Sequence, residues 1–367
     1  MANSQVARSS DPGTAHCMKL AIITDTYFGA RNDSLQFDAF FRRFYEEVFF
    51  PYLDESQIKT VIHLGDVFDR RKYINFQVLR SCKEYFFKQL EDRGIDLWVI
   101  PGNHDTFYKN TNEVNSLDLL LKEYTNITVV QDAATHKFDE QDFDFIPWIC
   151  ESNREETLEF IHRARTRETF CFGHFELEGY DMFRGVRNQT GMGPSTLKSY
   201  PTVLTGHFHH RSARDNIYYL GSPYEFTWSD HNDPRGFHVF DTHSTDLTFI
   251  ENPNKIFHKI YYDDRAELPN PAVFKRTCVK VIIAHKEDYP KFDKFVEGLY
   301  NNDVIELTIH EDFSEFENES LGTDAIDIED TMTLLSEFVD TTETAKDKEK
   351  LKTLLKTLYI EAQALEV

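Results

Sequence analysis

Cysteine is scarce in this sequence, and long apolar runs are missing. The 367 residues include five scattered cysteines, none in a Cys-x-x-Cys pair: Cys17, Cys82, Cys150, Cys171 and Cys278. This scatter argues against a disulfide framework or a zinc ribbon and indicates reduced thiols in a cytoplasmic setting. No apolar stretch approaches the roughly 18 residues needed to cross a bilayer, so we expect no membrane span and no membrane partner.

Basic residues are also in short supply. Lys and Arg total 40 against 63 Asp and Glu, which gives a net charge of −23. The segment 303–367 holds 18 acidic residues and 5 lysines, so −13 of this charge lies there. The rest is nearer to balance, with basic groups such as those at 42–43 and 70–72. Because long-range electrostatics oppose nucleic-acid binding, we expect any such ligand to be held jointly with a partner that supplies positive charge.

Apolar and aromatic residues are plentiful, at 40% and 14% of the chain, which excludes wholesale disorder, and a length of 367 residues allows two or three domains. Residues 1–17 are small and polar and are interpreted as a leader or a disordered tail. From 18 to 255, apolar runs alternate with helical patterns, which predicts an α/β domain of two packed β-sheets flanked by helices. The expected strands are 20–24, 60–64, 97–100, 127–130, 143–146, 170–172, 202–204 and 237–240, and the expected helices are 37–50 and 75–93.

The pattern changes beyond residue 255. A strand, strand, helix and strand are expected in 256–310, enough for a small α/β capping domain. Residues 311–330 are acidic and predict a flexible linker. In 331–367 apolar residues recur at helical spacing, which predicts a pair of amphipathic helices. Two helices beyond a polar linker cannot bury their faces alone, so we favour a partner-binding pair over a pair that packs on itself.

Five short segments carry the chemistry. In chain order they are Asp25-Thr26-Tyr27, Gly65-Asp66, Gly102-Asn103-His104-Asp105, Gly173-His174 and Gly206-His207-Phe208-His209. Each follows an apolar run, where a strand ends and a loop begins. Alone, each is more typical of a turn, or of a surface or core histidine. As an ordered series, their oxygen and nitrogen donors predict a site for two divalent metal ions, a standard device for cleaving phosphate esters.

The residue types indicate separate roles at such a site. The two oxygens of Asp66 can bridge two cations, whereas Asn103 offers one neutral carbonyl oxygen. Because residues two apart in an extended segment point the same way, His207 and His209 can both face the metals. A mixed oxygen and nitrogen donor set suits Mn²⁺ or Fe²⁺ better than Mg²⁺.

His104 directly follows a candidate ligand and cannot easily share its metal. We expect it to contact the scissile phosphate or to protonate the leaving oxygen, with Asp105 as a candidate orienting partner.

The ordered segments resemble the signature of the calcineurin-like metallophosphoesterases. Flanking residues narrow the resemblance to SbcD-type double-strand-break repair nucleases, and further to the recombination endonucleases of T-even-like bacteriophages. The segments that carry this narrower match are 65–72, 102–105, 108–110, 146–151, 173–179, 206–209 and 232–237. The match covers 18–255 well and the tail by layout only. It implies a DNA exonuclease or endonuclease that acts at double-strand ends during replication, recombination and repair in the bacterial host cytoplasm.

The resemblance also implies ligands and partners. One metal would be held by Asp25, Asp66 and His209, and a second by Asp66, Asn103, His174 and His207, with His104 as the catalytic histidine. The implied cofactor is Mn²⁺, with Mg²⁺ as the alternative. The implied partners are DNA, a second copy of the chain, and an SMC-like coiled-coil ATPase of the SbcC type bound through 331–367.

Tyr27 departs from the family pattern, which has a metal-binding His at this position. A phenol with a pKa near 10 is a poor replacement at neutral pH, although a phenolate can bind iron-like metals. We keep Tyr27 as a candidate ligand. The hypothesis is that the first metal site is incomplete and the nuclease impaired.

Two other functions remain open. A phosphatase of the same superfamily would share the metals but has no use for a tethered helix pair. A catalytically silent scaffold subunit would explain Tyr27, but the otherwise nearly complete ligand set argues against long decay. Co-purification with an ATPase tests the first alternative, and metal content with activity of a Tyr27→His form tests the second.

Overall fold

A computed structural model describes residues 18–163, 169–310 and Lys348. The expected leader at 1–17, the acidic linker at 311–330 and, apart from Lys348, the helix pair at 331–367 lie outside the described residues. These assignments stay predictions.

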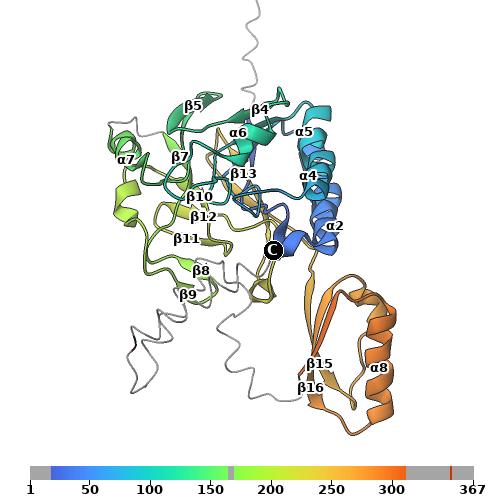
Figure 1. The fold of residues 1–367 in the computed structure, drawn as a ribbon. Coiled ribbons are helices and arrows are strands. Elements are labelled where there is room, and N and C mark those ends of the chain that lie inside the picture. The colour runs from blue at the N-terminus through green and yellow to red at the C-terminus, as the bar shows by residue number, and fades with distance from the viewer. Residues whose placement is uncertain (1–17, 164–168, 311–347, 349–367) are drawn as a thin grey trace, which may run out of the picture.

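The first of two six-stranded sheets, in the main body of the molecule in Figure 1, carries the first three polar segments. Its strand order is β14-β13-β1-β2-β3-β4. β1 to β4 are mutually parallel, whereas β13 and β14 pair antiparallel with their neighbours. The strands are β1 (Lys19–Ile23), β2 (Thr60–His63), β3 (Asp96–Val99), β4 (Ile127–Val129), β13 (Gly236–Asp241) and β14 (Leu247–Glu251).

The second sheet has the order β11-β12-β10-β7-β6-β5. β6, β7, β10 and β12 are parallel, and the edge strands β5 and β11 are antiparallel to them. Its strands are β5 (Ala134–Phe138), β6 (Gln141–Ile146), β7 (Phe170–His174), β10 (Val203–Gly206), β11 (Ser212–Arg214) and β12 (Ile217–Tyr219). A separate hairpin contains β8 (Asp181–Phe183) and β9 (Val186–Arg187).

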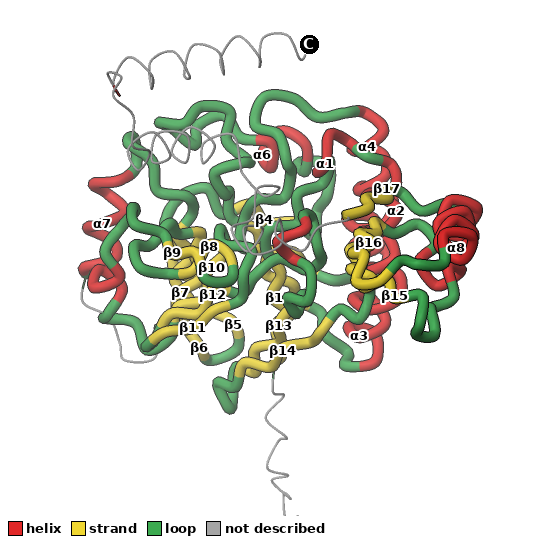
Figure 2. The backbone as a smooth tube through the Cα atoms, turned by 90° about the horizontal axis from the view of Figure 1, so that it is seen from below, coloured by secondary structure: helices red, strands yellow, loops and turns green. Residues whose placement is uncertain are grey.

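The sheets pack face to face between helices. In β1, Leu20 and Ile22 join a core with Phe143 and Phe172 of the second sheet, because alternate strand residues point to opposite faces. Ala21, on the other face, joins the core under the helices. Figure 2 shows the strands between α7 on one side and α2 and α3 on the other. The predicted class, two packed sheets flanked by helices, is confirmed.

The covering helices are short and partly continuous. Those beside the first sheet are α1 (Ala30–Asp33), α2 (Leu35–Phe44), η1 (Tyr45–Phe49), α3 (Phe50–Glu55), α4 (Phe76–Cys82), η2 (Lys83–Phe87), α5 (Lys88–Asp92) and α6 (Ser116–Leu120). α7 (Arg154–His162) and η3 (Pro194–Leu197) lie beside the second sheet, and η4 (Trp228–Asp230) is a single turn. Within the described residues, every helix is too short or too polar to cross a lipid bilayer.

Both long helices expected from the sequence contain a π-helical turn, η1 and η2. In η1 the N–H of Phe50 donates to the carbonyl of Tyr45, five residues earlier. Pro51, which follows, lacks an N–H and would clash with a carbonyl four residues back in a regular helix, so the wider turn accommodates it. The sequence of η2 contains no proline and offers no comparable reason.

A smaller three-stranded parallel sheet follows residue 256. It contains β15 (Phe257–Asp263), β16 (Cys278–His285) and β17 (Glu306–His310), with α8 (Tyr289–Asn301) packed on it and the turn η5 (Pro271–Phe274). α8 begins where Asp288 accepts the N–H of Lys291 at 3.0 Å and Pro290 occupies the first turn. The boundaries and the capping role of this part stay predictions.

One carboxylate anchors this smaller sheet to the main body. Glu225 Oε2 accepts the backbone N–H of Ile256 at 2.7 Å and that of Phe257 at 3.1 Å. The ring of Phe257 lies 4.8 Å from that of Trp228, centroid to centroid. The start of β15 is therefore fixed by contacts with the segment that follows His207 and His209.

Candidate metal centre

The polar segments meet because parallel strands end at the same edge of each sheet. Asp25, Asp66 and Asn103 follow the carboxyl ends of β1, β2 and β3. His174 is the last residue of β7, and His207 follows β10 in the second sheet. Ligands of α/β proteins bind outside the carboxyl ends of strands. The structure thus brings together side chains that lie up to 182 positions apart in sequence, as in the bonds from His207 to Asp25.

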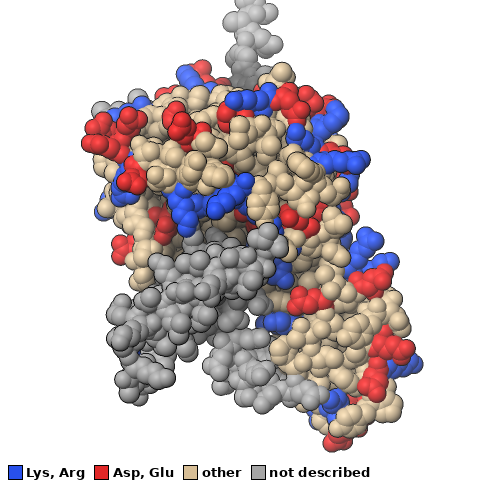
Figure 3. Space-filling view, viewed as in Figure 1, with Lys and Arg blue, Asp and Glu red and all other residues tan. Residues whose placement is uncertain are grey.

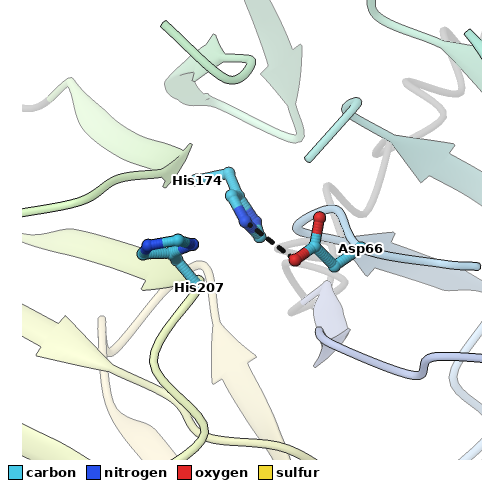
Figure 4. A group of neighbouring side chains, drawn as sticks. All are labelled: Asp66, His174 and His207. Atoms are coloured by element: carbon cyan, nitrogen blue, oxygen red, sulfur yellow. Dashed lines mark ion pairs between the residues drawn. The ribbon is translucent and has the colours of Figure 1, made fainter. Parts of the chain in front are cut away.

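Four donors face one another at the centre of this group. The ligand atoms of Asp66, His174 and His207 lie within 4.8 Å of one another (Figure 4). His174 Nε2 is 3.4 Å from Asp66 Oδ2. Asn103 Oδ1 lies 3.0 Å from His174 Nε2 and 2.9 Å from His207 Nδ1. One carboxylate, one amide oxygen and two imidazole nitrogens fit a divalent ion such as Mn²⁺. This set matches the expected ligands of the second metal.

The expected first-metal ligands are arranged differently. Both oxygens of Asp25 accept the N–H of His207, at 3.2 and 3.1 Å, and Thr24 Oγ1 donates to one of them at 2.7 Å. The phenol of Tyr27 donates to Asp66 Oδ2 at 2.6 Å. Its ring lies edge-on to that of His209, with centroids 4.9 Å apart. Among the described residues, neither Asp25 nor His209 belongs to a group of three or more acidic, His or Cys side chains with ligand atoms within 4.8 Å. This half does not fit a metal ion.

Close packing of the loops explains the glycine before Asp66, Asn103 and His207. A Cβ on Gly102 would lie 2.1 Å from Asp66 Oδ1, and a Cβ on Gly206 would lie 2.0 Å from Thr24 Oγ1. Gly65 has φ +96°, which few other residues adopt. The Gly-Asp, Gly-Asn and Gly-His pairs in the sequence therefore combine a ligand with a residue small enough to let another ligand loop approach.

Left-handed backbone recurs at the site. Asp25, Tyr27, Asp66 and His207 have φ values of 53°, 42°, 54° and 92°. Such conformations are uncommon for non-glycine residues and cluster at functional sites. The loops are held in these conformations by bonds such as Tyr27 N–H to the carbonyl of Asp66, at 3.2 Å.

His104 lies beside this group. Its backbone N–H donates to Asp66 Oδ1 at 2.8 Å, and its Nδ1 lies 2.6 Å from the carbonyl oxygen of Asp69. Because a carbonyl only accepts, Nδ1 carries the proton in that contact. The sequence did not point to Asp69 as the group that orients this ring.

Asp105 is fully buried and connects two loops. One oxygen accepts the N–H groups of Val67 and Phe68 at 3.0 and 3.2 Å, and the other accepts the N–H of Gly102 at 2.9 Å. These bonds place the Asp66 and Asn103 loops against each other. A role of Asp105 in orienting His104 stays a prediction.

Burial and pairing set the charges of the group. Burial alone would raise the pKa of Asp66, but the charges of His174 and His104 and the bonds from His174 and Tyr27 hold it well below its usual value. Burial would lower the pKa of His174, but Asp66 and Asp25 raise it to about 9. Before metal binding, Asp66 and His174 therefore form a buried ion pair, and a metal must displace the proton of His174.

Burial shifts the other two histidines and Asp25 toward their neutral forms. Burial, with the charge of His174, lowers the pKa of His207 to about 3, and burial lowers that of His209 to about 4. Burial raises the pKa of Asp25 to about 7, against the opposing effect of His174. Neutral imidazoles are the form that binds metals.

Two neighbours of the site were not found from the sequence. The ring of Trp148 lies 5.2 Å from His207 and 5.9 Å from His174, centroid to centroid. Arg235, 3% exposed, donates to the carbonyl of His209 and pairs with acidic side chains at 2.6 and 2.9 Å, those of Asp230 and Asp233. Both residues lie in segments on which the family resemblance rests. That resemblance was the one feature of the sequence that could have pointed to them.

Comparison with known proteins agrees with this geometry. The family described as Calcineurin-like phosphoesterase matches residues 18–252. Exonuclease subunit 1 of Enterobacteria phage T4 is 33% identical over 314 residues, 85% of this chain and 90% of the phage protein. Putative phosphoesterase 078R of Invertebrate iridescent virus 3 is 26% identical over 56% of this chain and 57% of its own length. The DNA double-strand break repair protein Mre11 of Sulfolobus acidocaldarius is 26% identical over 53% of this chain and 50% of its own.

These matches confirm the resemblance inferred from the five segments. The family match spans both large sheets and every expected metal ligand. The match to the phage exonuclease subunit extends over most of both chains. The chain belongs to the calcineurin-like phosphoesterase family.

Proposed function

We propose that this chain is the nuclease subunit of a DNA recombination and repair complex and hydrolyses DNA phosphodiester bonds with divalent metal. The observation that carries the proposal is the convergence of Asp66, Asn103, His174 and His207 from two sheets, with His104 beside them. Similarity to an exonuclease subunit and to a DNA repair protein supports DNA as the substrate.

The chain's own residues hold the ion and move a proton. A divalent ion at this group, Mn²⁺ by donor preference and Mg²⁺ as the alternative, would supply charge stabilisation to the phosphoryl group. As an imidazolium whose Nδ1–H is held by the carbonyl of Asp69, His104 would give its Nε2 proton to the leaving oxygen and be left as the neutral ring. Asp105 would keep the loops of Asp66 and Asn103 in register through its three backbone bonds.

DNA would be engaged jointly with partners. Figure 3 shows acidic and basic side chains interspersed over the described part of one face, and the net charge of −23 opposes attraction of DNA to this chain alone. We propose an SMC-like ATPase of the SbcC type, bound through 331–367, and a homodimer in the bacterial cytoplasm.

Tyr27 supports a further part of the proposal, that the nuclease is impaired. Its phenol bonds to the carboxylate that both metals would share. Restoring the family residue with Tyr27→His should raise Mn²⁺-dependent cleavage of linear duplex DNA. Equal activity of the two forms would reject the impairment.

The function is tested with the full chain and its Tyr27→His form. Each is assayed with Mn²⁺ on linear duplex DNA, on a phosphodiester and on a phosphomonoester, with and without the ATPase. The proposal expects diester and DNA cleavage, loss of cleavage in Asn103→Ala, and loss of ATPase binding when 331–367 are removed. Preferential monoester hydrolysis would favour a phosphatase. No hydrolysis by either form would favour a silent scaffold.

A further inference from the structure

We propose that this chain binds a single divalent ion, held by Asp66, Asn103, His174 and His207, and that the phenol of Tyr27 takes the place of the other ion. This inference rests on the proposed function, because it concerns the same centre. It goes further by specifying how many ions the centre holds and which side chain decides that number.

Both oxygens of Asp66 already accept hydrogen bonds from neighbouring groups. To bridge two ions, a carboxylate must turn lone pairs toward both. Asp66 Oδ1 already accepts the N–H of His104 at 2.8 Å. Asp66 Oδ2 accepts the phenol of Tyr27 at 2.6 Å and faces His174 Nε2 at 3.4 Å. On Oδ2, the side that remains for a metal is the one toward His174, where the other three donors lie.

The ring of Tyr27 is closely packed by its neighbours. The side chain is buried, with 6% of the residue exposed. Its ring packs edge-on against three rings, with centroids 4.9 Å from His209, 5.0 Å from His104 and 5.4 Å from Phe226. The backbone N–H of Tyr27 is also bonded to Asp66 O, at 3.2 Å. The ring is thus fixed from several directions, and it lies between His209 and the carboxylate with which His209 would share an ion.

The remaining donors, Asp25 and His209, already contact other groups of the protein. Both oxygens of Asp25 accept the N–H of His207, and Thr24 donates to one of them. His209 packs its ring against Tyr27 and against Phe226, at 5.5 Å from the latter. The polar and aromatic contacts of this half are therefore met within the protein, by a neutral phenol in place of a cation. The half that contains Asn103 instead gathers four ligand atoms around one point.

The test counts ions and measures whether they are coupled. The metal-free full chain is titrated with Mn²⁺ by calorimetry, bound metal is measured after desalting, and low-temperature electron paramagnetic resonance records the spectrum. We expect one ion per chain with the six-line signal of isolated Mn²⁺. Tyr27→His should bind two ions with an exchange-coupled spectrum. Tyr27→Phe, which keeps the ring but not the hydroxyl, should still bind one, and Asn103→Ala should lose it.

The outcomes separate this inference from the proposed function. Two coupled ions in the unaltered chain would overturn the inference and leave the nuclease proposal standing. One ion in Tyr27→His would also overturn it, because Tyr27 would then not decide the number. No bound Mn²⁺ in any form would reject the metal centre and both proposals with it. Should Tyr27→His fail to fold, as judged by circular dichroism, the count in the unaltered chain and in Tyr27→Phe still decides.

Discussion

Asp105 accepts the backbone N–H of Gly102 at 2.9 Å, across the loop that carries Asn103. Its second oxygen holds the Asp66 loop through the N–H groups of Val67 and Phe68. One buried carboxylate thus sets the spacing between two ligand loops that follow neighbouring strands.

Asp105→Asn should destabilise the protein and weaken metal binding. An amide keeps one accepting oxygen but turns an NH₂ group toward a backbone N–H, which leaves a buried donor unsatisfied and costs roughly 1–3 kcal/mol. Urea unfolding and Mn²⁺ titration measure the two effects. Asp139→Asn, the same change at an exposed loop residue with φ 54°, should alter stability by less than about 0.5 kcal/mol. Equal stability of the two variants would show that Asp105 does not connect the loops.

His104→Gln should separate chemistry from metal binding. The backbone N–H that reaches Asp66 Oδ1 is kept, so Mn²⁺ affinity should stay within about twofold. Loss of a proton donor should reduce kcat by about 10²–10⁴-fold. Diester hydrolysis in the Tyr27→His background, together with calorimetric titration, measures both. A matching loss of metal affinity would mean that the side chain of His104 supports the ligands and does not act on the substrate.

Glu225 should make stability fall as pH rises. Burial raises the pKa of Glu225 from 4.5 to about 7, against the opposing bonds from Ile256 and Phe257. Between pH 4.5 and 7 the folded protein holds a proton on Glu225 that the unfolded chain has released. The contribution of Glu225 to the free energy of unfolding is therefore full below pH 4.5 and is lost as pH rises through 7. Its size is roughly 3 kcal/mol. The stability of Glu225→Gln relative to the unaltered chain should therefore be higher at pH 8 than at pH 4.5. Glu113→Gln, at an exposed position, is the control, and parallel pH profiles for Glu225→Gln and the unaltered chain would refute the effect.

Arg235→Met should cost far more than Arg184→Met. Arg235 is 3% exposed and pairs with Asp230 at 2.6 Å and Asp233 at 2.9 Å, so its removal leaves buried acids without their partner and costs about 3–5 kcal/mol. The side chain of Arg184 is 57% exposed and lies 3.6 Å from Asp233, a contact worth at most about 1 kcal/mol. Denaturant unfolding of both variants checks the contrast, which similar losses would contradict.

The sequence predicted the strands that hold the site because their signals are local. β1, β2, β3, β7 and β10 are largely buried, mainly apolar runs that lead into the polar segments, and each expected strand overlaps the observed one. The short strands β5, β8, β9, β11, β12 and β14 were not predicted. All but β12 are half exposed and lack a continuous buried apolar run, and β12 is only three residues long. The π turns were not predicted either, because one wider turn leaves the apolar face of a helix unchanged.

Contacts between distant segments were beyond sequence reasoning. The bonds of Asp105 go to backbone amides up to 38 positions away, and no pattern of side chains records them. Arg235 acts on the carbonyl of His209, 26 positions earlier, for the same reason. Tyr27 stood out as a departure from the family pattern. Its bond to Asp66 depends on how two loops meet, and only the folded chain reveals that.

The left-handed backbone at position 27 has an evolutionary consequence. The loop keeps φ 42° at Tyr27 and its N–H bond to Asp66 O, so a His introduced there enters a conformation that already exists. His and Tyr codons differ by a single base. Under the proposed function, one base change would therefore exchange a phenol for a metal-binding imidazole at position 27 without refolding the loop.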